Sequence, residues 1–515
     1  MIERWNKVWT DDVNYLNDTK KMLKDYNGKY QSIDCKSWNL IKENNHFIEK
    51  YYYIDWSYFK FLNNYSGVHQ FLSVYRLLSP ICTLVLPLVI MLSSWFIIRL
   101  SGIKMDFSTF FKFIKQYIKQ QTSIGRIFQN FSSASSSSKC YALFSIIMYF
   151  IQIYNNIMVL VNFNKNLIEM HEYIESIRNY MIKTCENMIN YSNIISKYKS
   201  YNTFNNELSM NYRKMNILIE RIQDIPSTHK SLRGVCYVGY VQKMIYEFYN
   251  DKDLENVMEY SFGFNGYIDN INGVKENLRI KNISYGTFNT SRKTNFKDAY
   301  YPPLIENDSS VQIVKNTYNL DKEFLISGPN ASGKTTILKT TLFNIICSQQ
   351  LGVGFYKKAN IKVYSNLFCY LNIPDTSGRD SLFQAEARRC IEIINKIKEV
   401  PEENTFCIFD ELYSGTNHYE AISSAYAFLN YLVDNHKFHF MMSTHFIDLC
   451  KKLEKSNKKI GNMKMCVKKK HDDFVYSYKI KRGISDVKGG VKVLRDLNYP
   501  DEIINKTQHF LENEF

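Results

Sequence analysis

The segment FLISGPNASGKTT, residues 324–336, is the feature that most restricts how this chain can fold. Its part from Gly328 to Thr335 fits the phosphate-loop pattern GxxxxGK[ST]. The apolar residues 324–326 predict a short buried strand before the loop, and the pattern from Thr336 onward predicts a helix after it. A strand, a glycine-containing loop and a helix in this order predict an α/β domain whose loop N–H groups bind nucleotide phosphates.

Two side chains of this loop have predicted chemical roles. Lys334 is expected to reach the β and γ phosphates of ATP, and the hydroxyl of Thr335 is expected to hold Mg²⁺. Within the loop itself, the residues expected to bind the cofactor are Gly328, Pro329, Asn330, Ala331, Ser332, Gly333, Lys334, Thr335 and Thr336.

Two further apolar runs end in residues suited to ATP hydrolysis. Residues 405–409 form a β-rich run that ends in Asp410 and Glu411. An aspartate at the carboxyl end of a buried strand can hold Mg²⁺, and the adjacent glutamate can act as general base on the attacking water. A third run, residues 437–442, leads to His445, which is expected to sense the γ phosphate and relay hydrolysis.

These motifs together resemble the ATPase domain of the MutS family, whose members are relatives of the ABC ATPases. The resemblance is carried by GPNASGKTT, by FDELYSGTNHYEA at residues 409–421 and by STHF at residues 443–446. Residues 378–386, GRDSLFQAE, are similar to the family signature G-R-S-T-F-x-x-E with one extra residue, Asp380. The tail from residue 483 resembles the family's carboxyl-terminal helix, turn and second helix. The resemblance covers residues 300–515.

This resemblance implies an ABC-type P-loop ATPase domain that uses ATP and Mg²⁺ and works as a homodimer or as a heterodimer with a MutS-like subunit. Ser381, in the signature, would complete the ATP site of the partner subunit. Asn330 matches the family's GPN and would contact the nucleotide. The implied function is ATP-dependent clamping of mismatched or branched double-stranded DNA, in mismatch repair or related DNA maintenance.

Several positions depart from the family pattern. The aromatic residue that stacks on adenine in relatives is replaced at about Ile313, and SGTN at residues 414–417 lacks the family's arginine. No stretch resembles the mismatch-recognition domain; residues 47–49 spell its Phe-x-Glu wedge in unrelated surroundings. An alternative function is therefore a membrane-anchored MutS-like ATPase that acts as a motor or scaffold without mismatch recognition.

Two uncharged stretches, residues 77–98 and 140–164, are each long enough to cross a bilayer and predict a transmembrane hairpin. The segment between them, residues 99–139, is basic and would contact anionic lipid. The positive-inside tendency would put this segment in the cytoplasm, opposite the phosphate loop. The alternative is that both stretches are buried helices of a large helical domain.

The remaining pattern predicts a mainly α-helical region before the ATPase domain. From residue 165 to about 199, apolar residues follow the spacing of a heptad seam, which predicts a lever or bundle helix. The expected domains are an amino-terminal helical region (1–76), the two apolar segments (77–164), a helical core or lever (165–281), the ATPase domain (282–482) and a helix-turn-helix dimerisation tail (483–515).

Composition and the amino terminus add three general expectations. The formal charge of +15 favours an anionic partner such as DNA or a membrane surface, with composition drift as the alternative. The 11 cysteines include no CxxC pair and no Cys/His cluster at zinc spacing, which indicates reduced thiols in an intracellular compartment. The amino terminus lacks the apolar core of a signal peptide.

Overall fold

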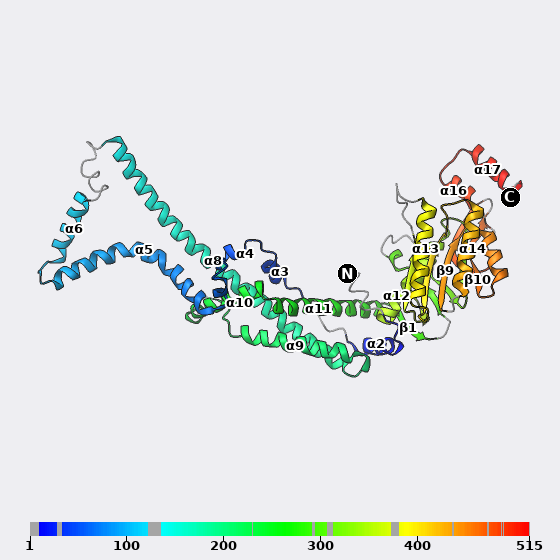
Figure 1. Cartoon of the computed structure of the whole chain (residues 1–515), viewed down its shortest axis with the longest axis horizontal. Coiled ribbons are helices and arrows are strands. Elements are labelled where there is room, and N and C mark those ends of the chain that lie inside the picture. The colour runs from blue at the N-terminus through cyan, green and yellow to red at the C-terminus, as the bar shows by residue number, and fades with distance from the viewer. Residues whose placement is uncertain are drawn as a thin grey trace. The chain divides into compact units, whose positions relative to one another are not determined.

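The computed structural model describes residues 10–27, 33–121, 135–228, 230–290, 294–305, 313–371, 381–434, 437–470, 473–485, 487 and 489–513. The chain divides into two compact units. Unit 1 comprises Met1–Tyr30, Asn193–Asn205 and Asp269–Phe515, and unit 2 comprises Gln31–Ser192 and Asn206–Ile268. Figure 1 shows the elements of both.

Unit 1 contains two β-sheets. The first has the strand order β3-β2-β6-β1-β5, with β1 (Ser284–Asn289), β2 (Thr294–Ala299), β3 (Asn316–Leu320), β5 (Val353–Gly354) and β6 (Lys358–Lys362). The second has the order β11-β10-β4-β9-β8-β7, with β4 (Glu323–Ser327), β7 (Asn366–Tyr370), β8 (Thr405–Asp410), β9 (Phe438–Thr444), β10 (Ile460–Lys470) and β11 (Asp473–Arg482).

The helices of unit 1 lie around these sheets (Figure 1). They are α2 (Val13–Asp25), α12 (Lys334–Leu351), α13 (Leu382–Glu399), α14 (His418–Asp434), α15 (Ile447–Ser456), α16 (Gly490–Asp496) and α17 (Asp501–Asn513), with short 3₁₀ turns η2 (Lys199–Tyr201) and η3 (Pro302–Leu304). The tail contains the pair α16 and α17.

The second sheet is buried on both faces, which explains why its central strands are continuous apolar runs. Alternate side chains enter different cores: Leu325 and Phe409 pack with α13, α14 and α15, whereas Ile326 and Ile408 pack with α12 and the first sheet. Strands β10, β4, β9, β8 and β7 run parallel to one another, and the edge strand β11 is antiparallel to β10. Parallel pairing brings the carboxyl ends of β4, β8 and β9 to one edge.

Unit 2 is helical in its described residues. Its elements are α3 (Lys36–Lys42), α4 (Phe47–Lys50), η1 (Lys60–Asn64), α5 (Ser66–Leu100), α6 (Phe107–Gln121), most of α8 (Ser136–Ile195), most of α9 (Asn202–Ile222), α10 (Leu232–Asn250) and the first part of α11 (Lys252–Arg279). The predicted heptad seam lies on α8, and its members are buried: Ile174, Ile177, Met181, Thr184, Met188, Tyr191 and Ile195. Thr184, which interrupts the apolar seam, accepts a hydrogen bond from the Asn265 amide at 2.9 Å.

The two apolar stretches lie within α5 and α8, the helices that are joined through α6 (Figure 1). Large apolar side chains of both helices are exposed, among them Val85, Leu86, Val89, Ile90, Phe96 and Ile97 of α5 and Leu143, Phe144, Ile147, Phe150, Tyr154 and Val161 of α8. By length and composition, the part of α8 from residue 139 is apolar enough to cross a membrane. Its most apolar 18-residue stretch has a mean hydropathy of 1.7, and none of that stretch is buried. In α5, only a shorter apolar helix, Val89–Leu100, is recognised within the described residues. The alternative of helices buried within this chain does not agree with this exposure.

Candidate functional site

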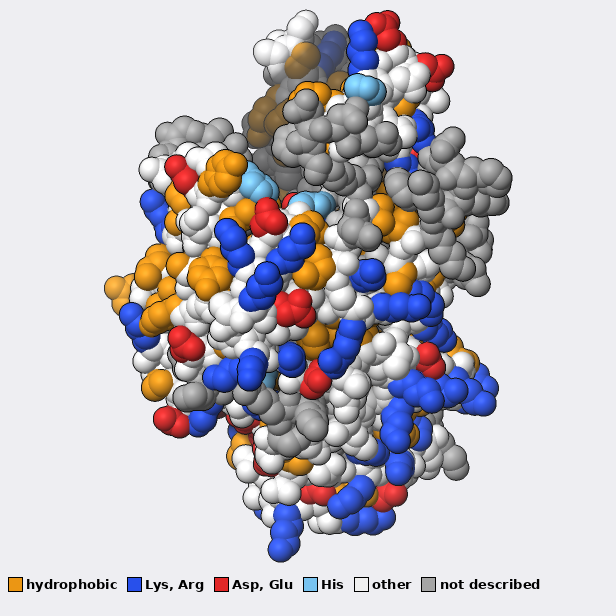
Figure 2. Space-filling view, turned by 90° about the vertical axis from the view of Figure 1, so that its right-hand side faces the viewer, with side chains coloured by type: hydrophobic (Ala, Val, Ile, Leu, Met, Phe, Trp, Pro, Cys, Tyr) orange, Lys and Arg blue, Asp and Glu red, His pale blue; other side chains and the backbone are white. Residues whose placement is uncertain are grey.

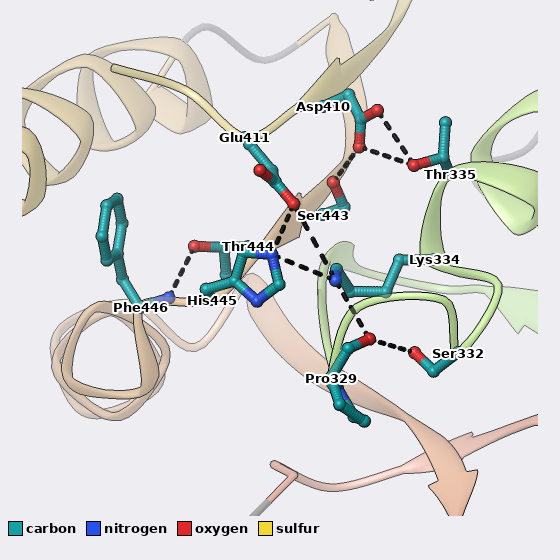
Figure 3. Close-up of polar contacts among 10 residues, drawn as sticks. All are labelled: Pro329, Ser332, Lys334, Thr335, Asp410, Glu411, Ser443, Thr444, His445 and Phe446. Carbon is teal, nitrogen blue, oxygen red and sulfur yellow. Dashed lines mark hydrogen bonds and ion pairs between the residues drawn. The ribbon is translucent and has the colours of Figure 1, made fainter. Parts of the chain in front are cut away.

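The phosphate loop connects β4 to α12, as the sequence predicts. Ala331 and Gly333 have φ values of 58° and 96°, so two left-handed residues turn the chain from the strand into the helix. The Ser332 hydroxyl donates to the carbonyl oxygen of Pro329 at 2.7 Å, which closes the turn (Figure 3). Gly333 is the N-cap of α12, and the helix begins at Lys334. The helix amino terminus therefore faces the loop, where an anion is favoured.

Lys334 points back over the loop (Figure 3). Its side chain is only 5% exposed, and its Nζ lies 3.3 Å from the carbonyl oxygen of Pro329 and 3.8 Å from Oε1 of Glu411. Burial lowers the pKa of Lys334, and the nearby carboxylates of Glu411 and Asp410 oppose that shift. A cation buried this deeply needs an anionic partner. The carboxylate of Glu411 is 3.8 Å away, which leaves room for another anion to approach Lys334 more closely.

Thr335 and Asp410 meet at the first turn of α12. The Thr335 hydroxyl lies 3.1 Å and 3.0 Å from the two carboxylate oxygens of Asp410. The hydroxyl of Ser443, on the neighbouring strand β9, also donates to Asp410 (Figure 3). A hydroxyl and a carboxylate at one point are the oxygen donors that Mg²⁺ takes when phosphates supply its other ligands, so these residues fit a Mg²⁺ site. Ser443 had no predicted role.

Glu411 and His445 form a close pair, with 2.6 Å between Oε1 and Nε2. The hydrogen bond from His445 lowers the pKa of Glu411, which outweighs the opposite effect of burial. Nε2 of His445 also lies 3.3 Å from Nζ of Lys334. Because this nitrogen carries the proton donated to Glu411, it cannot also accept from Lys334. The three residues form one contiguous polar cluster.

A cavity of about 440 Å³ opens beside this cluster. Its lining includes loop and helix residues between Asn330 and Thr340, together with Glu411, Tyr301, Val314 and Tyr478. Tyr301 and Tyr478 are aromatic residues that the sequence did not assign to a base contact. Tyr478 comes from β11, so no local pattern links it to the loop. Ile313, the position expected to replace the adenine-stacking residue, precedes the lining residue Val314.

Ser381 is exposed and forms the N-cap of α13. Its hydroxyl accepts from the backbone N–H of Gln384 at 3.3 Å, and the Gln384 side chain accepts from the N–H of Ser381 at 2.9 Å. Among the described residues, nothing joins Ser381 to the phosphate loop of its own chain. The rest of the predicted signature before it, residues 378–380, lies outside the described residues.

Glu386, at the start of the second turn of α13, links this helix to the loop that follows Glu411. Its side chain is 3% exposed and accepts from the N–H and hydroxyl of Ser414, at 3.1 Å and 2.9 Å, and from the N–H of Gly415 at 3.2 Å. A Cβ on Gly415 would lie 2.7 Å from the backbone nitrogen of Phe383, so the loop packs tightly on α13. The sequence identified Glu386 as part of a motif but gave no sign of this contact.

Comparison with known proteins identifies the domain that carries the site. The family model MutS domain V matches residues 324–513, and this domain is an ATPase domain. The DNA mismatch repair protein MutS of Finegoldia magna is 28% identical over 211 residues, which are 41% of this chain and 23% of that protein. The proteins of the same name from Staphylococcus haemolyticus and Acholeplasma laidlawii are 26% and 27% identical over 39% and 41% of this chain. The match spans 22% and 24% of those two proteins, so the chain spans about a quarter of the length of these relatives.

We predict that Glu386→Ala loosens the loop after Glu411. The substitution leaves the N–H groups of Ser414 and Gly415 without their buried acceptor, which costs about 1 to 3 kcal/mol. Amide hydrogen exchange measured by mass spectrometry should therefore accelerate about 5- to 150-fold in peptides that cover residues 411–417. The matched control is Glu392→Ala on the exposed side of the same helix, which should leave these peptides unchanged. Equal exchange in both variants would contradict the role given to Glu386.

Proposed function

We propose that this chain, which belongs to the MutS family through residues 324–513, hydrolyses ATP to control its grip on DNA. The observation that carries the ATPase part is the convergence of Lys334, Thr335, Asp410, Glu411 and His445 at the carboxyl ends of three parallel strands (Figure 3). Each of these residues has the chemistry that one part of phosphoryl transfer to water requires.

Binding of ATP begins with the loop N–H groups and Lys334. The buried ammonium of Lys334 would exchange its contact with Glu411, at 3.8 Å, for direct contact with the β and γ phosphates. Thr335 and Asp410 would hold Mg²⁺, which supplies charge neutralisation between the phosphates when bound. Ser443 donates to Asp410 and so orients its carboxylate. Tyr301 and Tyr478 are placed to contact the base from the wall of the cavity.

Hydrolysis requires a base that is ionised and correctly oriented. The hydrogen bond from His445 lowers the pKa of Glu411, so its carboxylate is ionised at neutral pH and can accept a proton from the attacking water. Release of Lys334 to the phosphates would remove one of the two side chains that contact the carboxylate of Glu411. The remaining contact with His445 would then report the state of the γ phosphate to β9 and to α15, the next helix of the chain.

The complete site is proposed to need two subunits. Ser381 is exposed at the amino terminus of α13 and has no contact with the described loop residues of its own chain, as expected for a residue that serves a partner. The helices α16 and α17 would contact the partner subunit. ATP bound by the loop of one subunit and Ser381 of the other would close the pair, and hydrolysis would reopen it.

Mismatched or branched double-stranded DNA is the proposed ligand. The similar proteins named above are DNA mismatch repair proteins, and the formal charge of +15 favours a polyanion. In Figure 2, Lys and Arg side chains are spread widely over the lower part of the face shown, with Asp and Glu scattered among them. Contacts from such side chains to phosphates would give affinity and strong salt dependence.

The first prediction of this proposal concerns Glu411→Gln. This variant keeps Lys334 and the loop, so it should bind ATP while its hydrolysis rate falls by about 10²-fold or more, because a general base contributes about that much. Titration against homoduplex, mismatched and four-way-junction DNA at two salt concentrations should then show ATP-dependent affinity that discriminates DNA structure. Structure-blind binding that modest salt abolishes would leave the ATPase but reject the DNA clamp. Wild-type protein without nucleotide is the control.

The second prediction tests Ser381 in trans. Ser381→Ala and Lys334→Ala should each reduce steady-state ATP hydrolysis about 10-fold or more when tested alone. Mixing the two variants places one intact loop opposite one intact Ser381 in each mixed dimer, so part of the activity should return. Mixing Lys334→Ala with Glu411→Gln is the control, because both residues act in the site of their own subunit, so each site of the mixed dimer keeps one damaging substitution and no activity should return. No recovery in the first mixture, with dimers shown to exchange, would place Ser381 outside the partner's site.

A membrane-anchored ATPase is a second candidate function, and the exposed apolar surface of α5 and α8 favours it. A soluble protein rarely leaves so many large apolar side chains in contact with water. Both helices exceed the roughly 20 residues that span a bilayer core. The segment between them includes α6, which carries Lys112 and Lys115 among aromatic side chains and suits an anionic lipid surface.

The third prediction separates these candidates by deletion of residues 77–164, with a short Gly-Ser linker in their place. The base of α5 should stay folded because Gln70 accepts from the N–H of Gly239 at 2.8 Å and Ser73 donates to Gln242 at 2.8 Å. We expect the full chain to float with vesicles that contain anionic lipid and to resist a carbonate wash, whereas the shortened chain stays soluble. A full chain that remains monodisperse without detergent would reject the membrane anchor.

A further inference from the structure

Unit 1 contains a second cavity, of about 1230 Å³, apart from the phosphate loop. The last turns of α11, the strand β1 and the residues that precede β3 and β6 form its walls. It shares no described lining residue with the cavity beside the phosphate loop. Nothing in the proposed ATPase chemistry uses it.

The charges on its walls are mostly positive. Five cationic side chains line the cavity, namely Lys275, Arg279, Lys281, Lys315 and Lys357. The carboxylates that line it are those of Glu276 and Asp298. Glu276 is engaged by Arg279 at 2.6 Å and 3.0 Å, so its charge is largely neutralised by a residue of the same helix. The Lys275 ammonium donates to the carbonyl oxygen of Leu23 at 2.9 Å, a neutral acceptor that fixes its position without cancelling its charge.

Three of these cations form no ion pair with a carboxylate among the described residues. Lys281, Lys315 and Lys357 are exposed, and among the described residues no ion pair joins any of them to an acidic side chain. The Lys315 ammonium lies over the ring of Tyr300, 5.1 Å from its centroid, which holds a cation at the cavity wall by a contact that does not neutralise it.

A second group of cations adjoins the same wall. Tyr285 lines the cavity, and the ammonium groups of Lys20 and Lys24 lie 5.9 Å and 5.6 Å from its ring centroid. Lys20 also donates to the carbonyl oxygen of Gly286 at 3.0 Å. Burial, and after it repulsion from Lys24, lowers the pKa of Lys20. Like charges that repel one another are stabilised when an anion enters between them.

We propose that this basic cavity is a second anion site, which binds the phosphate groups of a nucleic-acid strand or of a free nucleotide. Several cations spread over a cavity of this size suit a ligand that carries several negative charges. A ligand with a single carboxylate would neutralise only one of these cations. The ring of Tyr285 also lines the wall and offers a stacking surface to a base. The proposal stands apart from the ATPase chemistry of the phosphate loop.

The test uses the full chain with Lys281→Gln, Lys315→Gln and Lys357→Gln combined. These side chains are exposed, so the variant should keep the thermal midpoint of the parent. Its matched control combines Lys398→Gln, Lys451→Gln and Lys452→Gln, which removes the same charge from exposed positions on α13 and α15. Binding of single-stranded and duplex oligonucleotides is measured across salt concentrations, and binding of ATP is measured by calorimetry in a Lys334→Ala background that disables the phosphate loop.

If a strand occupies the cavity, the triple variant should bind oligonucleotides about tenfold more weakly, and the magnitude of the slope of log K against log salt should fall by about 2 for single strands and about 3 for duplexes, because about three phosphate contacts are lost. If a free nucleotide occupies it, oligonucleotide binding should match the control, and the ATP binding that persists in the Lys334→Ala background should disappear. Equal behaviour of the triple variant and its control in both measurements overturns the proposal. Basal ATP hydrolysis, measured in parallel without DNA, reports separately on the proposed function.

Discussion

Parallel hydrogen bonding of β4, β8 and β9 is the constraint on which the rest of the site depends. The pairing of Ser327 with Thr444 and of Asp410 with Ser443 brings three strand ends to the same level of the sheet. The chain then turns there in three different ways: into the phosphate loop, into Glu411 and into His445. Because the strands are buried on both faces, a shift of register would move apolar side chains out of two cores at once. The positions of the polar residues are thus fixed by apolar packing.

The charges at this edge are arranged to balance one another before a substrate arrives. Lys334 is almost fully buried, and its carboxylate neighbour Glu411 is shared with His445. An ion pair of this kind contributes little net stability, since desolvation offsets most of the attraction. It does keep the loop, the base and the third strand in contact. The polar cluster therefore contributes more to phosphate binding than to the stability of the fold.

Much of this site could be predicted from local sequence, because each of its main residues follows a continuous apolar run. The strand before the loop, the helix after it, Asp410, Glu411 and His445 all carry such signals. Ser443, Glu386 and Tyr478 do not: their roles arise from pairing between strands or from a helix packed on a distant loop. The basic cavity escaped prediction for the same reason, since its cations come from segments between Lys275 and Lys357 that only the fold brings together. Sequence patterns also could not decide whether the apolar stretches are covered; their exposure became visible only with the helices in place.

One feature of unit 2 has mechanical consequences. The apolar stretch from residue 140 and the buried heptad seam are parts of a single uninterrupted helix of 60 residues, α8. At 1.5 Å per residue, such a helix is about 90 Å long. Its described length contains no break that could act as a joint. A force perpendicular to the helix axis on the exposed half is therefore transmitted as torque to the buried half. Tension in the surroundings of the exposed half would in this way act mechanically on the helical core.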